Sequence, residues 1–337
     1  MTMPTTSFVV TCYNLGAYLD ETLDSLFAQT VQDFEVVVVN DGSTDGATCR
    51  LLADLDRPRT RVVHGERRGL PGARNMGVRH AVGMYLCMVD ADDLLEPTYL
   101  ERSLQALESR PDLAFASHWL RAFGDETWDW TPTDCGFPAL LHANTLNGAA
   151  LMRRDLFERV GGFDETLVDG CEDWEFWIRV VEAGFAGVII PEFLFRYRRR
   201  ADSMSRTMHA VPGMPALYRQ LVDRHPDLFT RHLVPLLGHR DDEIASLSAS
   251  LWRHEEHWAS DLEGRQQWLG DNEVERQRAS DAARQAERAG QLEATRAEVE
   301  ALRAAIRGER EMQVALRASW SWRLTRPLRA LAGWVWR

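Results

Sequence analysis

Lysine is absent from this chain of 337 residues, so arginine supplies all 39 side chains of the Lys and Arg class. Acidic side chains number 51, and the formal net charge is −12 at pH 7. An acidic balance opposes binding to the phosphates of DNA and RNA. We therefore expect no nucleic-acid partner.

Paired cysteines and long apolar stretches are also lacking. The spacing of the cysteines matches neither a disulfide framework nor a zinc site, which indicates free thiols. No apolar run approaches the roughly 20 residues that span a bilayer, and the N-terminus does not resemble a signal peptide. We expect a cytoplasmic protein. The cysteines are Cys12, Cys49, Cys87, Cys135 and Cys171.

Carboxylates gather directly after one short apolar run. Tyr85–Val89 is followed by Asp90-Ala91-Asp92-Asp93. Carboxylates this close raise one another's pKa unless a cation neutralises them. Mg²⁺ is held by one or two protein carboxylates together with water and phosphate oxygens. The run predicts a Mg²⁺ or Mn²⁺ site for a nucleoside diphosphate; the alternative is a solvated turn with Asp93 as a helix N-cap.

Two further apolar runs end in polar residues. Phe8–Cys12 leads into Tyr13, and Phe34–Val39 leads into Asn40 and Asp41. Continuous apolar runs followed by helical patterns predict buried parallel strands, and ligands bind beyond the carboxyl ends of such strands. A tyrosine ring can stack on a base, and a carboxylate can accept the imide N–H of uracil or thymine.

The pattern predicts an α/β domain with a mainly parallel sheet, and an irregular segment at 123–144 read either as an acceptor-side loop or as exposed packing. Two closing strands are expected at Gly187–Ile190 and Phe193–Arg198. Helices are expected at Leu15–Gln29, Thr44–Leu55, Pro71–Val82, Pro97–Ser109, Arg153–Val160 and Asp173–Ala183.

Several short motifs occur in one order over residues 6–205, and together they resemble the inverting glycosyltransferases of family 2, of the type that builds bacterial envelope polysaccharides. The resemblance implies a GT-A fold. The motifs are Thr11-Cys12-Tyr13-Asn14, Asn40-Asp41-Gly42-Ser43-Thr44-Asp45, Gly69-Leu70-Pro71-Gly72-Ala73-Arg74-Asn75-Met76-Gly77, Asp90-Ala91-Asp92-Asp93, Gly161-Gly162-Phe163-Asp164-Glu165, Glu172-Asp173-Trp174-Glu175-Phe176-Trp177 and Tyr197-Arg198.

The resemblance also implies a nucleotide-sugar donor and a divalent metal, Mg²⁺ or Mn²⁺. UDP or dTDP is favoured as the nucleotide, and GDP is an alternative. Asp92 is the implied metal ligand. Many family members have a histidine metal ligand where Arg200 stands, and His209 is a possible substitute for that ligand. The implied donor-binding residues are Thr11, Tyr13, Asp41, Arg74, Asp90 and Arg198.

Glu172 and Asp173 precede an apolar helical pattern. Inversion by direct displacement needs a carboxylate that takes the proton of the acceptor hydroxyl. The resemblance assigns this role to Asp173, with Glu172 as the second candidate; a helix-dipole contact is the alternative reading. Trp174 and Trp177 are candidates for an acceptor platform, or for packing under the sheet.

The layout changes after the catalytic domain expected at 1–235. Residues 236–316 are strongly helix-forming, and an apolar seam predicts a long helix that forms a weak coiled coil. A homodimer through this helix is then possible, and a solvated helix is the alternative reading. The tail, 317–337, has five arginines, no acidic residue and Trp320, Trp322, Trp334 and Trp336. Tryptophan and arginine are typical of an amphipathic segment that binds an anionic membrane surface; a docking helix is the alternative.

These features predict a non-processive hexosyltransferase that is peripheral on the inner face of the cytoplasmic membrane. Its acceptor would be a hydroxyl of a lipid-linked or polymeric glycan. A noncatalytic membrane-tethered scaffold is the first alternative. A sugar nucleotidyltransferase is the second, although Thr11–Gly16 offers no glycine-rich phosphate loop.

Overall fold

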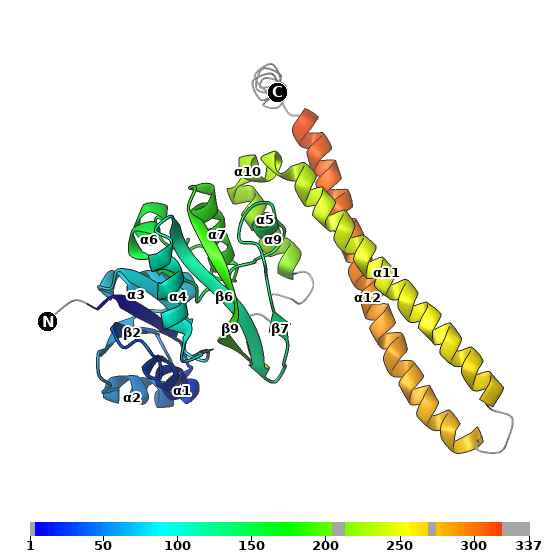
Figure 1. The fold of residues 1–337 in the computed structure, drawn as a ribbon, viewed down its shortest axis with the longest axis horizontal. Coiled ribbons are helices and arrows are strands. Elements are labelled where there is room, and N and C mark those ends of the chain that lie inside the picture. Colours follow the sequence, from blue (N-terminus) through cyan, green and yellow to red (C-terminus); the bar gives the residue numbers. More distant parts are fainter. Residues whose placement is uncertain (1–3, 204–212, 269–273, 319–337) are drawn as a thin grey trace. The chain divides into compact units, whose positions relative to one another are not determined.

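The computed structural model describes residues 4–203, 213–268 and 274–318 (Figure 1). The chain divides into two units, Met1–His232 and Leu233–Arg337. The first unit contains a sheet with helices on both faces, and the second contains two long helices.

A mixed sheet of nine strands forms the centre of the first unit. Its order is β3-β2-β1-β4-β8-β6-β9-β5, with β7 beside β6. The first four strands in this order are parallel to one another. Strand β8 is antiparallel to both of its neighbours, β4 and β6. The strands are β1 (Thr6–Cys12), β2 (Phe34–Asp41), β3 (Thr60–Gly65), β4 (Tyr85–Asp90), β5 (Leu94–Leu95), β6 (Leu113–Gly124), β7 (Asp129–Trp130), β8 (Leu151–Arg153) and β9 (Ala186–Arg199).

The helices of this unit lie where the helical patterns place them, and the ends of the six predicted helices differ from prediction by at most two residues. The segment expected to be irregular contains β7 and a short helix. The helices are α1 (Gly16–Phe27), α2 (Gly46–Asp54), α3 (Gly69–His80), α4 (Tyr99–Ser109), α5 (Ala139–His142), α6 (Arg154–Val160), α7 (Glu172–Glu182), α9 (Gly213–Arg224) and α10 (Pro226–Arg231).

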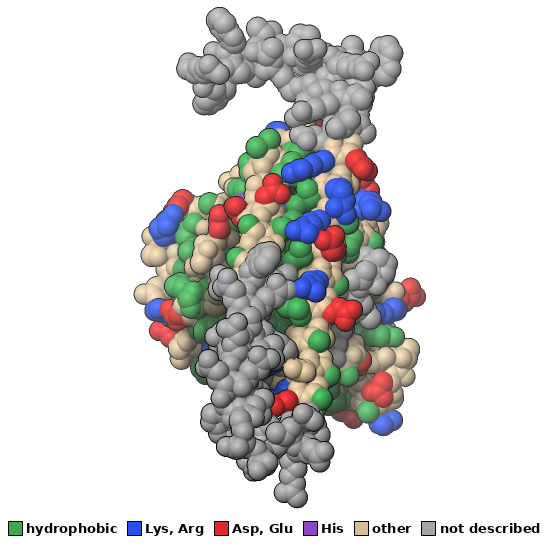
Figure 2. Space-filling model, turned by 90° about the vertical axis from the view of Figure 1, so that its right-hand side faces the viewer, with side chains coloured by type: hydrophobic (Ala, Val, Ile, Leu, Met, Phe, Trp, Pro, Cys, Tyr) green, Lys and Arg blue, Asp and Glu red, His purple; other side chains and the backbone are tan. Residues whose placement is uncertain are grey.

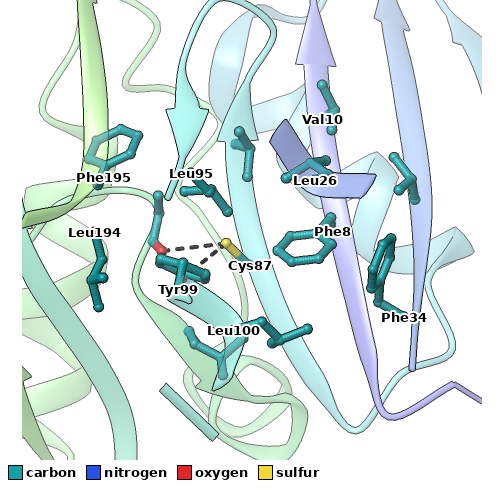
Figure 3. Packing of buried hydrophobic residues seen from close by; sticks show 14 of the residues in the cluster. Phe8, Val10, Leu26, Phe34, Cys87, Leu95, Tyr99, Leu100, Leu194 and Phe195 are labelled. Atoms are coloured by element: carbon teal, nitrogen blue, oxygen red, sulfur yellow. Dashed lines mark hydrogen bonds between the residues drawn. The ribbon is translucent and has the colours of Figure 1, made fainter. Parts of the chain in front are cut away.

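One face of the sheet packs against α1 and α4 in a continuous apolar core (Figure 3). Alternate residues of β1 point to this face, because side chains of a strand alternate between its two sides. Within the core, the Tyr99 hydroxyl lies 3.2 Å from Cys87 Sγ and donates to the Ala149 carbonyl. The core residues from these elements include Phe8, Val10, Cys12, Leu19, Leu23, Leu26, Leu100, Leu104 and Leu107.

Helix α3 lies on the opposite face, against β1 and β2. Its close approach depends on Gly77, because a Cβ there would lie 2.2 Å from Val9 Cγ1. Helix α7 covers the same side further along, where the Trp177 ring lies 4.8 Å from the Phe115 ring. The N-terminal parts of α3 and α7 thereby come close enough for Arg74 and Glu172 to form an ion pair.

The two closing strands predicted from the sequence are one strand, β9, which runs parallel to β6. The pairing passes from His118 with Ile190 to Trp119 with Phe193, so two residues of β9, Pro191 and Glu192, have no partner. Proline has no N–H to donate to a neighbouring strand. The interruption of the apolar pattern therefore marks a bulge, and the chain does not leave the sheet.

The single long helix predicted at the C-terminal side is also corrected: the second unit has two helices, α11 (Leu233–Trp268) and α12 (Val274–Ala318), which pack on each other as a hairpin (Figure 1). The seam residues Val299 and Ile306 are buried. Figure 2 shows side chains of both charge signs next to hydrophobic ones on the described part of one face of the molecule. No helix of the described residues has the length and hydropathy that crossing a membrane requires.

Candidate functional site

The parallel strands β1, β2 and β4 end at one edge of the sheet, and the predicted donor residues meet there. Thr11 is paired with Asp90 in the strand register. The Thr11 hydroxyl donates to Asp90 Oδ1 over 2.9 Å. Asp41 is the last residue of β2, and Tyr13 follows β1.

Asp41 is almost completely buried, and both of its carboxylate oxygens have hydrogen-bond donors. The main-chain N–H of Arg68 lies 2.8 Å from Oδ1, and Arg67 Nη1 lies 2.5 Å from Oδ2. The Arg67 guanidinium carbon is 3.5 Å from the centroid of the Tyr13 ring. One arginine thus links the two residues that were predicted to hold the base.

The acidic turn after β4 is held by two arginines of the β9 end. Arg200 Nε donates to Asp92 Oδ2 over 2.9 Å, and Arg198 Nε donates to the Asp92 carbonyl over 2.7 Å. The Arg198 N–H donates to Asp93 Oδ1 over 2.8 Å. Burial raises the pKa of the Asp92 carboxyl, Asp90 raises it further, and Arg200 opposes the shift. Burial and the two neighbouring carboxylates likewise raise the pKa of Asp93.

Arg74, in the second turn of α3, connects this turn to the first turn of α7. Nη2 lies 3.3 Å from Asp90 Oδ1, and Nη1 lies 2.7 Å from Glu172 Oε1. The Arg74 side chain is only 5% exposed. Burial opposes its charge, but Asp90, Glu172 and Asp173 raise its pKa above the ordinary value. Arg74 is therefore a permanent cation among three carboxylates.

The two candidate bases at the start of α7 differ in their surroundings. Glu172 is buried and paired with Arg74, and burial raises its pKa to about 7. Asp173 is half-buried, and its Oδ1 accepts the main-chain N–H of Trp174 over 2.7 Å. Burial raises the pKa of Asp173, against the opposing effect of Arg74. Of the two, Asp173 is the more accessible to a substrate.

Both tryptophans of α7 are inside the domain. Trp174 is 3% exposed and donates from Nε1 to the Leu140 carbonyl over 2.6 Å, and Trp177 is 1% exposed. Acceptor sugars stack on exposed ring faces, which neither indole presents. The structure favours the packing alternative for both residues.

Asp90 and Asp92 supply oxygen ligands of the kind that Mg²⁺ and Mn²⁺ prefer. Among residues 4–203, 213–268 and 274–318, no group of three or more His, Cys, Asp or Glu side chains is arranged to hold a metal ion. A metal shared with a diphosphate needs only one or two protein carboxylates. The crowding that raises the pKa values of Asp92 and Asp93 is a feature that a cation relieves, so the donor set fits such a metal.

One contact of the site was not anticipated from the sequence. Arg67 lies between β3 and α3, beside a second arginine, and no motif singles it out. Its position in a loop after the carboxyl end of a parallel strand was the available signal. His209, the suggested substitute ligand, lies outside the described residues.

Comparison with known proteins finds similarity to glycosyltransferases. Residues 7–161 match the family model described as glycosyl transferase family 2. Glycosyltransferase GlyG of Streptococcus pneumoniae is 38% identical over 223 residues, which cover 60% of this chain and 73% of GlyG. EpsH of Bacillus subtilis is 35% identical over 120 residues, and the match spans 35% of the length of either protein.

Solved structures agree on the architecture. The crystal structure of Staphylococcus aureus TarS 1-349 in complex with UDP-GlcNAc superposes with a TM-score of 0.52 at 20% sequence identity, over 60% of each chain. At this identity the likeness shows the fold, and it confirms the predicted GT-A architecture. The family model and the similarity to GlyG together show that this chain belongs to glycosyl transferase family 2.

Proposed function

We propose that this chain is an inverting glycosyltransferase that moves one sugar at a time from a nucleotide-sugar to a hydroxyl group of a glycan. One observation carries the proposal: Arg74 brings Asp90, from the donor edge of the sheet, and Glu172, from the start of α7, to one buried cation. The candidate base Asp173 thereby lies beside the candidate donor site. The GlyG relative is named a glycosyltransferase, and TarS has been crystallised with UDP-GlcNAc and with UDP. These relatives support a UDP-sugar, with dTDP and GDP as the other nucleotides to test.

Asp173 is the general base in this proposal. Its carboxylate takes the proton of the acceptor hydroxyl as the oxygen bonds to the anomeric carbon. The bond from that carbon to the diphosphate oxygen breaks, and its electron pair leaves with the diphosphate. The half-buried position of Asp173 permits this contact, whereas Glu172 is buried against Arg74. The raised pKa of Asp173 makes it a stronger base than an ordinary aspartate.

Tyr13 and Asp41 bind the base in this proposal, and Thr11 orients Asp90 toward the ribose. Asp92, with Asp90 beside it, would hold Mg²⁺ or Mn²⁺, which would offset the negative charge that develops on the departing diphosphate. Arg198 fixes the acidic turn through the Asp92 carbonyl and adds a positive charge near it. These residues supply binding and orientation, and Asp173 moves the proton.

The acceptor and its location belong to the same proposal. A lipid-linked or polymeric glycan at the cytoplasmic membrane face fits a tail rich in arginine and tryptophan, since both residue types favour anionic interfaces. The tail, from residue 319 onward, lies outside the described residues. The seam residues Val299 and Ile306 of α12 are already buried in the single chain, so a homodimer through this helix would use another of its faces. The oligomeric state in solution tests it.

Asp173→Asn tests the catalytic proposal. We expect this variant to bind UDP-sugar with unchanged affinity in calorimetry and to lose transfer by about 10²-fold or more, the scale of a general base. Asp155→Asn is the matched control, because Asp155 is an exposed carboxylate in the first turn of α6. A loss of donor affinity with unchanged single-turnover transfer would assign Asp173 to binding.

Two assays on the unmodified chain separate the alternative functions. A noncatalytic scaffold would bind donor without transfer or hydrolysis in the unmodified chain. A sugar nucleotidyltransferase would release pyrophosphate from a nucleoside triphosphate and a sugar phosphate.

A further inference from the structure

The Arg67 side chain lies where the proposed function places the nucleotide base. Its guanidinium carbon is 3.5 Å from the centroid of the Tyr13 ring, and Nη1 is 2.5 Å from Asp41 Oδ2. A base bound at this edge would make the same two contacts, by stacking on Tyr13 and by donating a ring N–H to Asp41. The guanidinium is planar and carries N–H donors, so it imitates the base in shape and in hydrogen bonding.

The backbone around Arg67 is held in place, and its side chain is half-exposed. Gly42 follows β2 with φ of 67°, and a Cβ there would lie 2.7 Å from the Arg67 nitrogen. The next main-chain N–H, that of Arg68, donates to Asp41 Oδ1 over 2.8 Å. The Arg67 side chain is 48% exposed, against 2% for Asp41. The loop therefore stays against the end of β2 when the side chain turns out to solvent.

The two oxygens of Asp41 consequently have different partners. Oδ1 is bound by a main-chain amide, and Oδ2 is bound by a half-exposed side chain. A base that reached Asp41 over Tyr13 would meet Oδ2 only after Arg67 had left. Leaving the subsite costs Arg67 a stacking contact and an ion pair.

From this overlap we propose that Arg67 closes the base subsite in the donor-free chain and is displaced by a base with a ring N–H, such as uracil, thymine or guanine. This inference rests on the proposed function of the Tyr13–Asp41 edge. Arg67 is then a specificity-determining residue, because only a base that replaces both of its contacts displaces it without loss. The apparent affinity for the base is lowered by the fraction of chains in which the subsite is closed.

Binding of uridine tests the inference, because uridine is neutral and its affinity is little affected by the loss of a positive charge. We expect Arg67→Ala to bind uridine about tenfold more tightly than the unmodified chain in calorimetry, a difference of about 1.4 kcal/mol. Arg68→Ala is the control. It removes the same charge from the next position, where the side chain pairs with Glu165, and it keeps the main-chain N–H for Asp41. We expect its uridine affinity to be unchanged.

Unchanged or weaker uridine binding by Arg67→Ala would overturn the inference and leave the proposed function standing. Equal tightening in both variants would attribute the effect to charge and would also overturn it. If neither the unmodified chain nor either variant binds uridine, UDP, dTDP or GDP, the proposed function fails, and this inference fails with it. Thermal unfolding of both variants without ligand checks that each is folded.

Discussion

Arg74 donates to Glu172 Oε1 over 2.7 Å although 98 residues separate them in the chain. The same guanidinium lies 3.3 Å from Asp90 Oδ1. The pair therefore ties the carboxyl end of a central strand to the helix that carries the candidate base. Four predictions concern this arrangement and the parts of the chain around it.

Replacing Arg74 by alanine leaves Glu172 buried without its ion-pair partner. Loss of one partner of a buried pair costs about 3–5 kcal/mol, so we expect a lower free energy of unfolding of that order in denaturant titrations at mildly alkaline pH. Arg110→Ala is the control, because Arg110 pairs with Asp112 on the exposed surface, where such pairs contribute little. Equal losses in the two variants would contradict a structural role for the buried pair.

Glu172 makes stability depend on pH. Burial raises the pKa of this carboxyl from 4.5 to about 7, so the folded chain holds its proton more tightly than the unfolded chain. Its contribution to stability is fully present below the unfolded pKa and is lost as the pH rises through about 7. As the pH rises from about 5 to about 8, we expect the free energy of unfolding of the unmodified chain to fall by up to about 3 kcal/mol relative to that of Glu172→Gln, measured by denaturant titration at each pH. If the free energies of unfolding of the two proteins differed by a constant amount over this pH range, the raised pKa of Glu172 would be refuted.

In the proposed site, Arg200 and a metal ion would compete for Asp92. Because Arg200 Nε lies 2.9 Å from Asp92 Oδ2, Arg200→Gln should free this oxygen and strengthen Mn²⁺ binding about tenfold, measured by electron paramagnetic resonance. Arg196→Gln removes the same charge from a half-exposed arginine of β9 whose Nε lies 3.9 Å from Glu96 Oε1, so the Mn²⁺ affinity of this variant should change little. Asp92→Asn should abolish Mn²⁺ binding. Full activity of that variant in excess EDTA would remove the metal from the proposed mechanism.

Truncation after Leu316 tests whether the tail, 317–337, binds the membrane surface. The five arginines of the tail should attract anionic lipid by roughly 1 kcal/mol for each charge near the surface, and the tryptophans should enter the interface. We expect the truncated chain to keep transfer to a soluble acceptor analogue and to lose sedimentation with anionic liposomes. Added salt should weaken binding of the full chain, because it screens the charges. Equal liposome binding by both forms would show that the tail is a docking or packing helix.

The strands and helices around the site were predictable because each depends on local pattern. Phe34–Val39 is a continuous apolar run, and such runs form buried strands whichever neighbours they acquire. The placement of Asp41 and Asp90 at one edge follows from the rule that parallel strands end on the same side. The bounds of β9 and the division of the C-terminal helix were not predictable in this way, because a bulge and a hairpin depend on which surfaces are available for pairing.

The sequence by itself determined the α/β order, the acidic turn after β4 and the carboxylates at the start of α7, since these follow from hydrophobic periodicity and from residue types at strand ends. Only the tertiary structure decided that Arg74 joins Asp90 to Glu172, that Arg67 covers Tyr13 and that Trp174 and Trp177 are buried. The physical reason is that side chains from distant elements meet only after helices have packed on the sheet. Burial, and the pKa shifts and ion pairs that accompany it, exists only in the packed chain.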